Sequence, residues 1–81
     1  MISFKPVISE KSIKLIESEN VLIFQTEKEA NKKKIKEEFE KMFNVKIKNI
    51  RTHIRDNKKY VYIKLKKEFP AIDIAMKLGV I

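Results

Sequence analysis

The side chains of this 81-residue chain most able to do chemistry are its cations, and their unbalanced positive charge is concentrated in one stretch. Residues 44–67 hold nine of the nineteen Lys and Arg side chains and a single acidic residue, Asp56. That stretch has a formal charge of +8, which equals the net charge of the whole chain. A lysine-rich strand edge that discourages aggregation would account for only a few of these cations. The pattern favours a polyanionic partner, and nucleic acid before an anionic membrane surface.

Two arginines in this stretch are the strongest candidates for phosphate contacts. Arg51 and Arg55 each carry a planar guanidinium that can donate two parallel hydrogen bonds to one phosphate, which lysine cannot do. The lysines expected to add positive charge beside them are Lys46, Lys48, Lys58 and Lys59. Lys11 and Lys32 are secondary candidates. Lys32 opens a run of three lysines at an expected helix start, so it is either a phosphate contact aided by free N–H groups or part of a solvated helix face.

Two tyrosines offer a second way of contacting nucleic acid. Tyr60 and Tyr62 alternate along an expected strand and share one face with Lys64 and Lys66. Aromatic rings among cations on an open sheet can stack unpaired bases. The alternative is that the rings pack beneath a helix, because three expected helices are available to cover the sheet. The sequence leaves both possibilities open.

Catalytic and metal-binding chemistry find little support in the sequence. His53 is the only histidine, the chain has no cysteine, and a zinc site needs three or four ligands at short spacing. A glycine-rich phosphate loop is excluded because Gly79 is the only glycine. We therefore expect no catalytic residue, no metal, no cofactor and no small-molecule substrate. No apolar run approaches the roughly 18 residues that span a bilayer, so no membrane insertion is expected.

Three helices are expected from apolar spacing and capping residues, at residues 9–19, 27–43 and 70–78. Ser9 is the expected N-cap of the first, and the third begins at Pro70 and ends before Gly79. Either Thr26 or Asn31 caps the second. Its apolar face is expected to hold Ile35, Phe39, Met42 and Phe43. Opposite charges four residues apart are expected to pair on its outer face, at Lys33–Glu37, Lys34–Glu38 and Lys36–Glu40.

Strands are expected at residues 20–26, 45–54 and 58–67, with a short edge strand at 2–4. The first of these is apolar almost throughout, which is typical of a central strand. In residues 45–54 the apolar parity changes near Lys48-Asn49, which predicts a bulge. Asp56-Asn57 tolerates the positive φ values of a hairpin turn. The order of elements predicts an α+β fold, with an antiparallel or mixed sheet of three to four strands covered by helices, and residues 1–81 as a single domain.

Four segments of the chain carry recognisable motifs. They are residues 5–12 (KPVISEKS), 30–47 (ANKKKIKEEFEKMFNVKI), 58–65 (KKYVYIKL) and 74–81 (IAMKLGVI). The first resembles the opening P-x-(I/V)-(S/T)-E-K-(S/A) of the twenty-third protein family of the large ribosomal subunit. The second and third are similar to that family's central A-N-K-x-x-I-K motif and K-K-A-Y-V-x-L strand. The fourth resembles the archaeal closing I-A-x-x-(L/I)-G-I-I, and all four occur in the family's order.

The resemblance implies a non-enzymatic constituent of the large ribosomal subunit, located in the cytoplasm on the ribosome. It implies binding to large-subunit rRNA near the polypeptide exit tunnel, beside the twenty-ninth protein of that subunit. It also implies a docking surface for nascent-chain factors such as the signal recognition particle, formed here by Ile8, Ser9 and Glu10. The family's V-N-T reads Ile50-Arg51-Thr52 here, a departure that puts arginine in place of the asparagine, and Thr52 is the remaining rRNA-binding candidate. The short Arg55–Lys59 loop is similar to archaeal members and lacks the long bacterial hairpin.

Two other functions remain as alternatives at this stage. A free-standing binder of single-stranded nucleic acid, similar to an RNA-recognition domain, would use Tyr60 and Tyr62 on an exposed sheet. A small regulatory domain of ferredoxin-like topology would need a concave apolar pocket with polar groups, and no sequence feature marks one.

Overall fold

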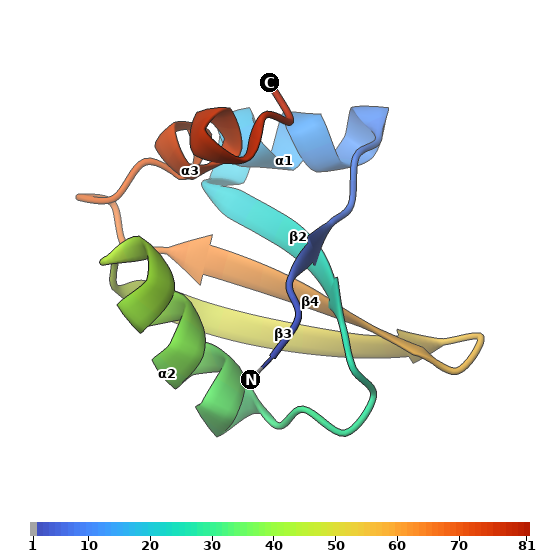
Figure 1. Ribbon diagram of the computed structural model, residues 1–81. Coiled ribbons are helices and arrows are strands. Elements are labelled where there is room, and N and C mark those ends of the chain that lie inside the picture. Colours follow the sequence, from blue (N-terminus) through green and yellow to red (C-terminus); the bar gives the residue numbers. More distant parts are fainter. Residues whose placement is uncertain (1) are drawn as a thin grey trace.

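The computed structural model describes residues 2–81 and shows an α+β fold (Figure 1). The elements in chain order are β1 (Lys5–Pro6), α1 (Glu10–Glu19), β2 (Val21–Thr26), α2 (Lys32–Phe43), β3 (Ile47–Arg55), β4 (Lys58–Leu65) and α3 (Ala71–Leu78). The strands form one antiparallel sheet in the order β1-β2-β4-β3. The expected fold class is confirmed, and the sheet is purely antiparallel.

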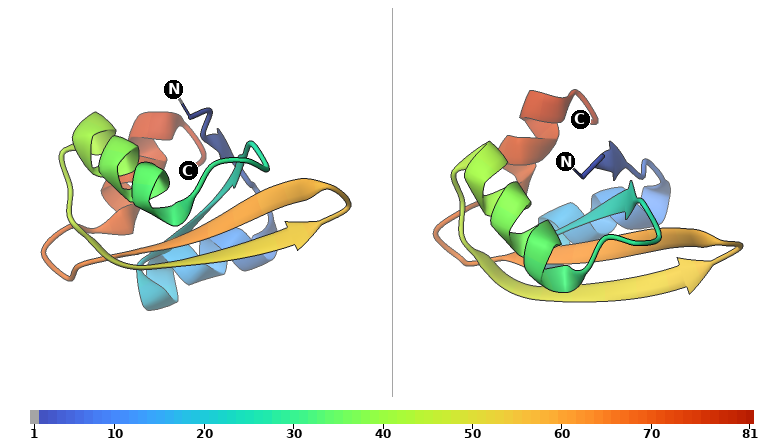
Figure 2. Two further views of the ribbon diagram at one scale, coloured as in Figure 1. Left: turned by 90° about the horizontal axis from the view of Figure 1, so that it is seen from below. Right: turned by 60° about the horizontal axis from the view of Figure 1, so that its bottom comes forward.

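The hydrophobic core lies on one face of the sheet, which we call the core face. Strand β2 contributes Leu22 and Phe24 to this face, and β4 contributes Val61, Ile63 and Leu65. Helices α2 and α3 cover it, whereas α1 lies across the β3–β4 hairpin from α2 (Figure 2). Helix α1 packs on β2 and on α3 at the end of the sheet. Because α1 covers only part of the other face, which we call the open face, much of that face stays accessible.

The helix starts follow from their capping residues. Ser9 and Ser12 form a reciprocal capping box at α1, in which the Ser9 side chain accepts from the Ser12 amide at 3.1 Å. Asn31 caps α2 by accepting from the Lys34 amide at 2.8 Å. Helix α2 therefore begins at Lys32, five residues later than expected, and the three lysines occupy its first turn.

The hairpin between β3 and β4 follows the sequence pattern closely. Asp56 and Asn57 form its turn with φ values of 51° and 65°. The pairing register shifts between Ile47 and Asn49, which confirms the bulge. Beyond the bulge the register is regular to the turn, ending with Arg55 opposite Lys58. The residues of the basic stretch therefore have fixed faces on the sheet.

Several features expected from local sequence patterns differ in the structure because residues far apart in the chain make contact. The edge strand is Lys5–Pro6, not residues 2–4, because Ile2 enters the hydrophobic core and its amide donates to the Glu38 carboxylate at 2.8 Å. Glu40 in turn accepts from the Ile47 amide at 2.8 Å. Within residues 2–81 the one salt bridge is Lys14–Glu10, so the three pairs expected on α2 do not form. The half-buried Glu38 and Glu40 bind backbone N–H groups instead.

The buried face of α2 is narrower than the spacing of its apolar residues predicted. Ile35 and Phe39 are fully buried, and Phe43 is half-buried against Phe39, with ring centroids 4.7 Å apart. Met42, expected on the same face, is 53% exposed. Phe39 also meets Phe4 and Phe24 at 5.5 and 5.4 Å between ring centroids. These aromatic contacts fix how α2 lies on the sheet.

Asn20 joins α1, β2, β4 and α3. It ends α1 in the left-handed conformation at φ 58°. Its side-chain amide lies within hydrogen-bonding distance of the carbonyls of Leu65, Lys66 and Phe69, and its Oδ1 accepts from the Ala71 amide at 2.6 Å. Pro70, the N-cap of α3, makes no side-chain capping bond. Asn20 therefore supplies that cap from 51 residues away.

Candidate nucleic-acid interface

The open face carries a regular pattern of aromatic and cationic side chains. Antiparallel pairing places Ile23, Tyr62 and Arg51 in one row across β2, β4 and β3. The next row holds Gln25, Tyr60 and His53. Directly opposed side chains in an antiparallel pair lie about 5 Å apart at Cβ, so Tyr62 is next to Arg51 and Tyr60 is next to His53.

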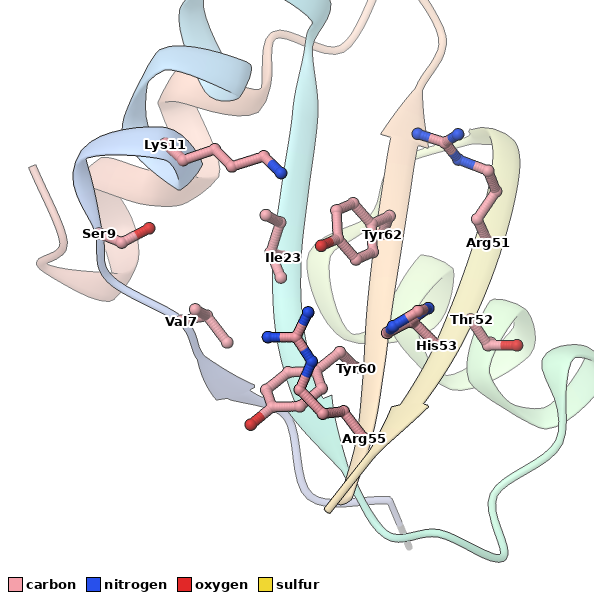
Figure 3. Close-up of a pocket in the computed structure, with 10 residues that line it drawn as sticks. All are labelled: Val7, Ser9, Lys11, Ile23, Arg51, Thr52, His53, Arg55, Tyr60 and Tyr62. Atoms are coloured by element: carbon pink, nitrogen blue, oxygen red, sulfur yellow. The ribbon is translucent and has the colours of Figure 1, made fainter. Parts of the chain in front are cut away.

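The side chains of these rows, apart from Gln25, line a shallow cleft of about 660 Å³, with Ile23, Tyr60 and Tyr62 as its floor (Figure 3). Helix α1 and the segment before it form one wall, and β3 forms the other. The lining residues are Val7, Ser9, Lys11, Ile23, Arg51, Thr52, His53, Arg55, Tyr60 and Tyr62. None of them is acidic, and three are lysine or arginine. The cleft therefore suits an anionic ligand.

Three of the cations predicted from the sequence meet at this cleft. Lys11 extends from α1 over β2, and Arg55 extends back from the hairpin end toward the middle of the cleft (Figure 3). The Arg51 guanidinium carbon lies 5.8 Å from the centre of the Tyr62 ring, a cation–π geometry that helps to hold the side chain in place. Lys11 is 40 residues from Arg51 in the chain, and tertiary structure alone brings them together.

The other predicted cations lie outside the cleft. Lys46 and Lys48 are exposed at the start of β3, at the end of the strand away from the hairpin turn. Lys58 is exposed beside that turn. Lys59 faces the opposite way, where its ammonium donates to the Ala30 carbonyl. Lys32 is exposed at the start of α2, on the other side of the sheet. The predicted set thus divides into a cleft group and a dispersed group.

Thr52 and His53 differ in how they relate to the cleft. The partner of Thr52 is the buried Val61, so the Thr52 side chain belongs to the core face although the residue borders the cleft. His53 is exposed on β3, and it lines the cleft beside Tyr60. Sequence reasoning did not select His53 for the site, but its shared parity with Arg51 and Arg55 was a usable signal.

The tyrosines take neither of the two extreme positions considered from the sequence. Tyr60 and Tyr62 are half-buried, and they line the cleft between α1 and β3. Val7 and Ile23, which sequence reasoning did not assign to a site, add apolar surface on the β2 side. The cleft consequently offers aromatic and apolar contacts on its floor with cations around them.

A second hollow, of about 550 Å³, lies where α2 meets the start of β3 and the loop before α3. It is lined by Glu37, Glu40, Lys41, Asn44, Val45, Lys46 and Phe69. Its two carboxylates and two ammonium groups leave no surplus of positive charge. It is therefore less suited to a polyanion than the first cleft.

Comparison with known proteins identifies the family. Residues 1–72 match the family model described as "Ribosomal protein L23". The chain belongs to the ribosomal protein L23 family. It is 43% identical to the large ribosomal subunit protein uL23 of Methanococcus vannielii over 76 residues, covering 93% of this chain and 88% of that protein. The Methanococcus aeolicus protein of the same name is 45% identical with the same coverage. The one from Methanothermobacter thermautotrophicus is 43% identical over 94% of this chain and 90% of its own length.

The match confirms the resemblance to an archaeal-type L23 protein inferred from the four motifs. The L23 relatives are ribosomal proteins by name, in agreement with a non-enzymatic role. None of the helices within residues 2–81 has the length and apolar character needed to cross a membrane.

The segment with the opening motif of the L23 family lies beside the cleft and faces solvent. Ile8 is 63% exposed, and Ser9 and Glu10 are exposed as well. Glu10 has 88% of its side chain accessible and pairs with Lys14 at 3.7 Å.

Proposed function

We propose that this chain is a constituent of the large ribosomal subunit, located in the cytoplasm, and that its 81 residues act as a single rRNA-binding domain. The observation that carries the proposal is the meeting of Lys11, Arg51 and Arg55 at an open sheet face whose lining has no carboxylate. The family relationship favours large-subunit rRNA as the polyanion over a regulatory ligand or a free single strand.

The physical basis of binding is neutralisation of phosphates. Each phosphate neutralised by a cation releases condensed counterions, so affinity falls as salt concentration rises. Arg51 and Arg55 can each bind a phosphate through two N–H groups, and Lys11 adds a point charge from the opposite wall. The dispersed cations Lys46, Lys48, Lys58 and Lys32 would meet phosphates farther along the same RNA. Folded RNA presents such phosphates as a surface, so its shape is recognised more than its sequence.

The test of this proposal is the salt dependence of binding to archaeal large-subunit rRNA. The double variant Arg51→Ala/Arg55→Ala should reduce the slope of log affinity against log salt by about two, one for each phosphate that is no longer neutralised. The control is Lys36→Ala/Lys77→Ala, which removes the same charge from exposed positions on α2 and α3, outside the cleft. Equal slopes for the two double variants in filter binding would reject the cleft as the rRNA interface.

The resemblance extends the proposal to location and partners. We place the protein at the exit of the polypeptide tunnel, next to the twenty-ninth protein of the large subunit. Ile8, Ser9 and Glu10 would then form a docking surface for a nascent-chain factor such as the signal recognition particle. Ile8 and Glu10 are exposed and lie outside the residues that line the cleft, so both can stay accessible while the cleft holds rRNA. Ser9 lines the cleft and would stand at the boundary between the RNA contact and the docking surface.

A further inference from the structure

We propose that the open-face cleft holds one unpaired nucleotide of the bound rRNA, with its base on the tyrosine floor and its phosphate among the cations. This inference rests on the proposed function and adds the kind of RNA element that the cleft takes. A duplex backbone lying across the sheet would need only phosphate contacts. The cleft offers aromatic and apolar side chains as well as cations.

The shape of the cleft fits a ligand of nucleotide size. Its volume of about 660 Å³ lies within the range of roughly 300–1,000 Å³ found for small-molecule sites. A flat interface with double-stranded RNA would not require such a hollow. The hollow exists because α1 stands over only the β2 side of the open face, while β3 remains uncovered on the other side.

The floor of the cleft suits a base. Tyr60 and Tyr62 occupy neighbouring positions on the same face of β4 and are half-buried, so their orientations are held while part of each ring stays accessible. Ile23 lies opposite Tyr62 on β2 and adds apolar surface. Bases stack well on aromatic rings regardless of sequence, because every base has a π face. The Arg51 guanidinium lies over the Tyr62 ring, 5.8 Å from its centre, and its own plane can stack against a base.

The rim of the cleft suits a phosphate. Lys11 extends from the α1 wall and Arg51 from the β3 wall, and the Arg55 side chain reaches from the hairpin end toward the middle of the cleft, so positive groups approach the floor from several sides. The ten lining residues include no acid that would repel a phosphate. A peptide would gain from the apolar floor, but only an acidic one would gain from the rim. The combination of an aromatic floor with a cationic rim favours a nucleotide.

The first test uses the free protein and does not depend on rRNA. The sequence has two tyrosines and no tryptophan, so intrinsic fluorescence reports on Tyr60 and Tyr62 alone. Millimolar uridine 5′-monophosphate should quench this emission, with free tyrosine as the control for light absorbed by the nucleotide. Ribose 5-phosphate, which lacks the base, should not quench it. Equal quenching by the two compounds, or none by either, would overturn the base-binding role.

The second test uses rRNA binding at one salt concentration. Tyr62→Leu should weaken affinity about five- to tenfold, the lower part of the range expected for losing one base–aromatic stack. Tyr62→Phe keeps the ring and should bind as the unchanged protein does, which also controls for folding. In chemical probing, one unpaired nucleotide should be protected by the unchanged protein and reactive with Tyr62→Leu.

The two proposals fail in different ways. If Tyr62→Leu binds rRNA as tightly as Tyr62→Phe while Arg51→Ala/Arg55→Ala still lowers the salt slope, the nucleotide cleft is wrong and the rRNA interface stands. If the salt slope is unchanged by the arginine variant, the proposed interface is wrong. Quenching by uridine 5′-monophosphate in that case would still support a nucleotide site on this face, whereas its absence would reject both.

Discussion

Asn20→Ala should destabilise the fold far more than an alanine at a comparable helix end. Asn20 holds the left-handed position after α1, and its side chain also ties together the end of β4, the loop that follows and the start of α3. Asn44 holds the same position after α2 at φ 54°, is exposed, and has no side-chain hydrogen bond among the described residues. The two asparagines thus occupy the same backbone conformation at a helix end, but only Asn20 makes side-chain hydrogen bonds to distant parts of the chain.

The expected magnitude follows from the bonds that alanine cannot make. The Asn20 amide has two hydrogens shared among three carbonyls at 3.1 to 3.3 Å, and its Oδ1 accepts one further bond from Ala71. Three bonds at about 1 kcal/mol each give about 3 kcal/mol. Alanine in a left-handed conformation adds about 1 kcal/mol. We therefore expect a loss of about 4 kcal/mol for Asn20→Ala and about 1 kcal/mol for Asn44→Ala.

Such a loss is large for this protein. At roughly 0.05–0.15 kcal/mol per residue, a domain of this length has a total free energy of unfolding of about 4–12 kcal/mol. Urea denaturation followed by circular dichroism at 222 nm measures the difference between the two variants directly. Glycine variants separate the two contributions, because glycine adopts positive φ without cost. Asn44→Gly should regain most of the lost stability, and Asn20→Gly should remain about 3 kcal/mol below the original protein.

Two results would refute this reasoning. If Asn20→Ala and Asn44→Ala lower the free energy of unfolding equally, the side-chain hydrogen bonds of Asn20 make no net contribution to stability. If Asn20→Gly is as stable as the original protein, Asn20 serves only as a helix end, and the start of α3 does not need its external cap.

The remaining predictions concern the core and the docking surface. Phe39→Ala should lower the free energy of unfolding in urea by about 3–5 kcal/mol because a fully buried ring is lost. Met42→Ala, at an exposed position of α2, should stay within about 0.5 kcal/mol, and comparable losses for the two variants would contradict the exposure of Met42. Ile8→Ala/Glu10→Ala should reduce pelleting of archaeal signal recognition particle with ribosomes and leave rRNA affinity unchanged. Unreduced pelleting would reject this segment as the docking surface.

The local elements were predictable because their signals lie within a few residues of one another. The Ser9 cap, the Asp56-Asn57 turn and the alternation of β4 each depend on neighbours in sequence, and the structure confirms them. The start of α2 was misplaced because two capping sites were available, and Asn31 was the one used. Glu38 and Glu40 were misread as helix-surface partners because their N–H donors, Ile2 and Ile47, lie elsewhere in the fold.

The candidate site was only partly readable from the sequence. Arg51 and Arg55 were selected for their side-chain chemistry, and strand parity places both on one face. Lys11 joins them because α1 packs on β2, an arrangement that no local pattern encodes. Whether α1 would cover Tyr60 and Tyr62 depended on its position on the open face, which the sequence of the helix does not specify. The cleft was therefore not predictable, although all three of its Lys and Arg side chains were candidates from the sequence.

The sequence by itself determined where the positive charge lies along the chain, because charge depends on residue type alone. It also determined most helices, the hairpin and its bulge, since caps, periodicity and turn residues act over short distances. Tertiary structure decided which sheet face stays open, which carboxylates bind backbone amides, and that Asn20 caps a helix 51 residues away. These outcomes depend on which surfaces the three helices bury, and burial is settled by the packing of the whole chain.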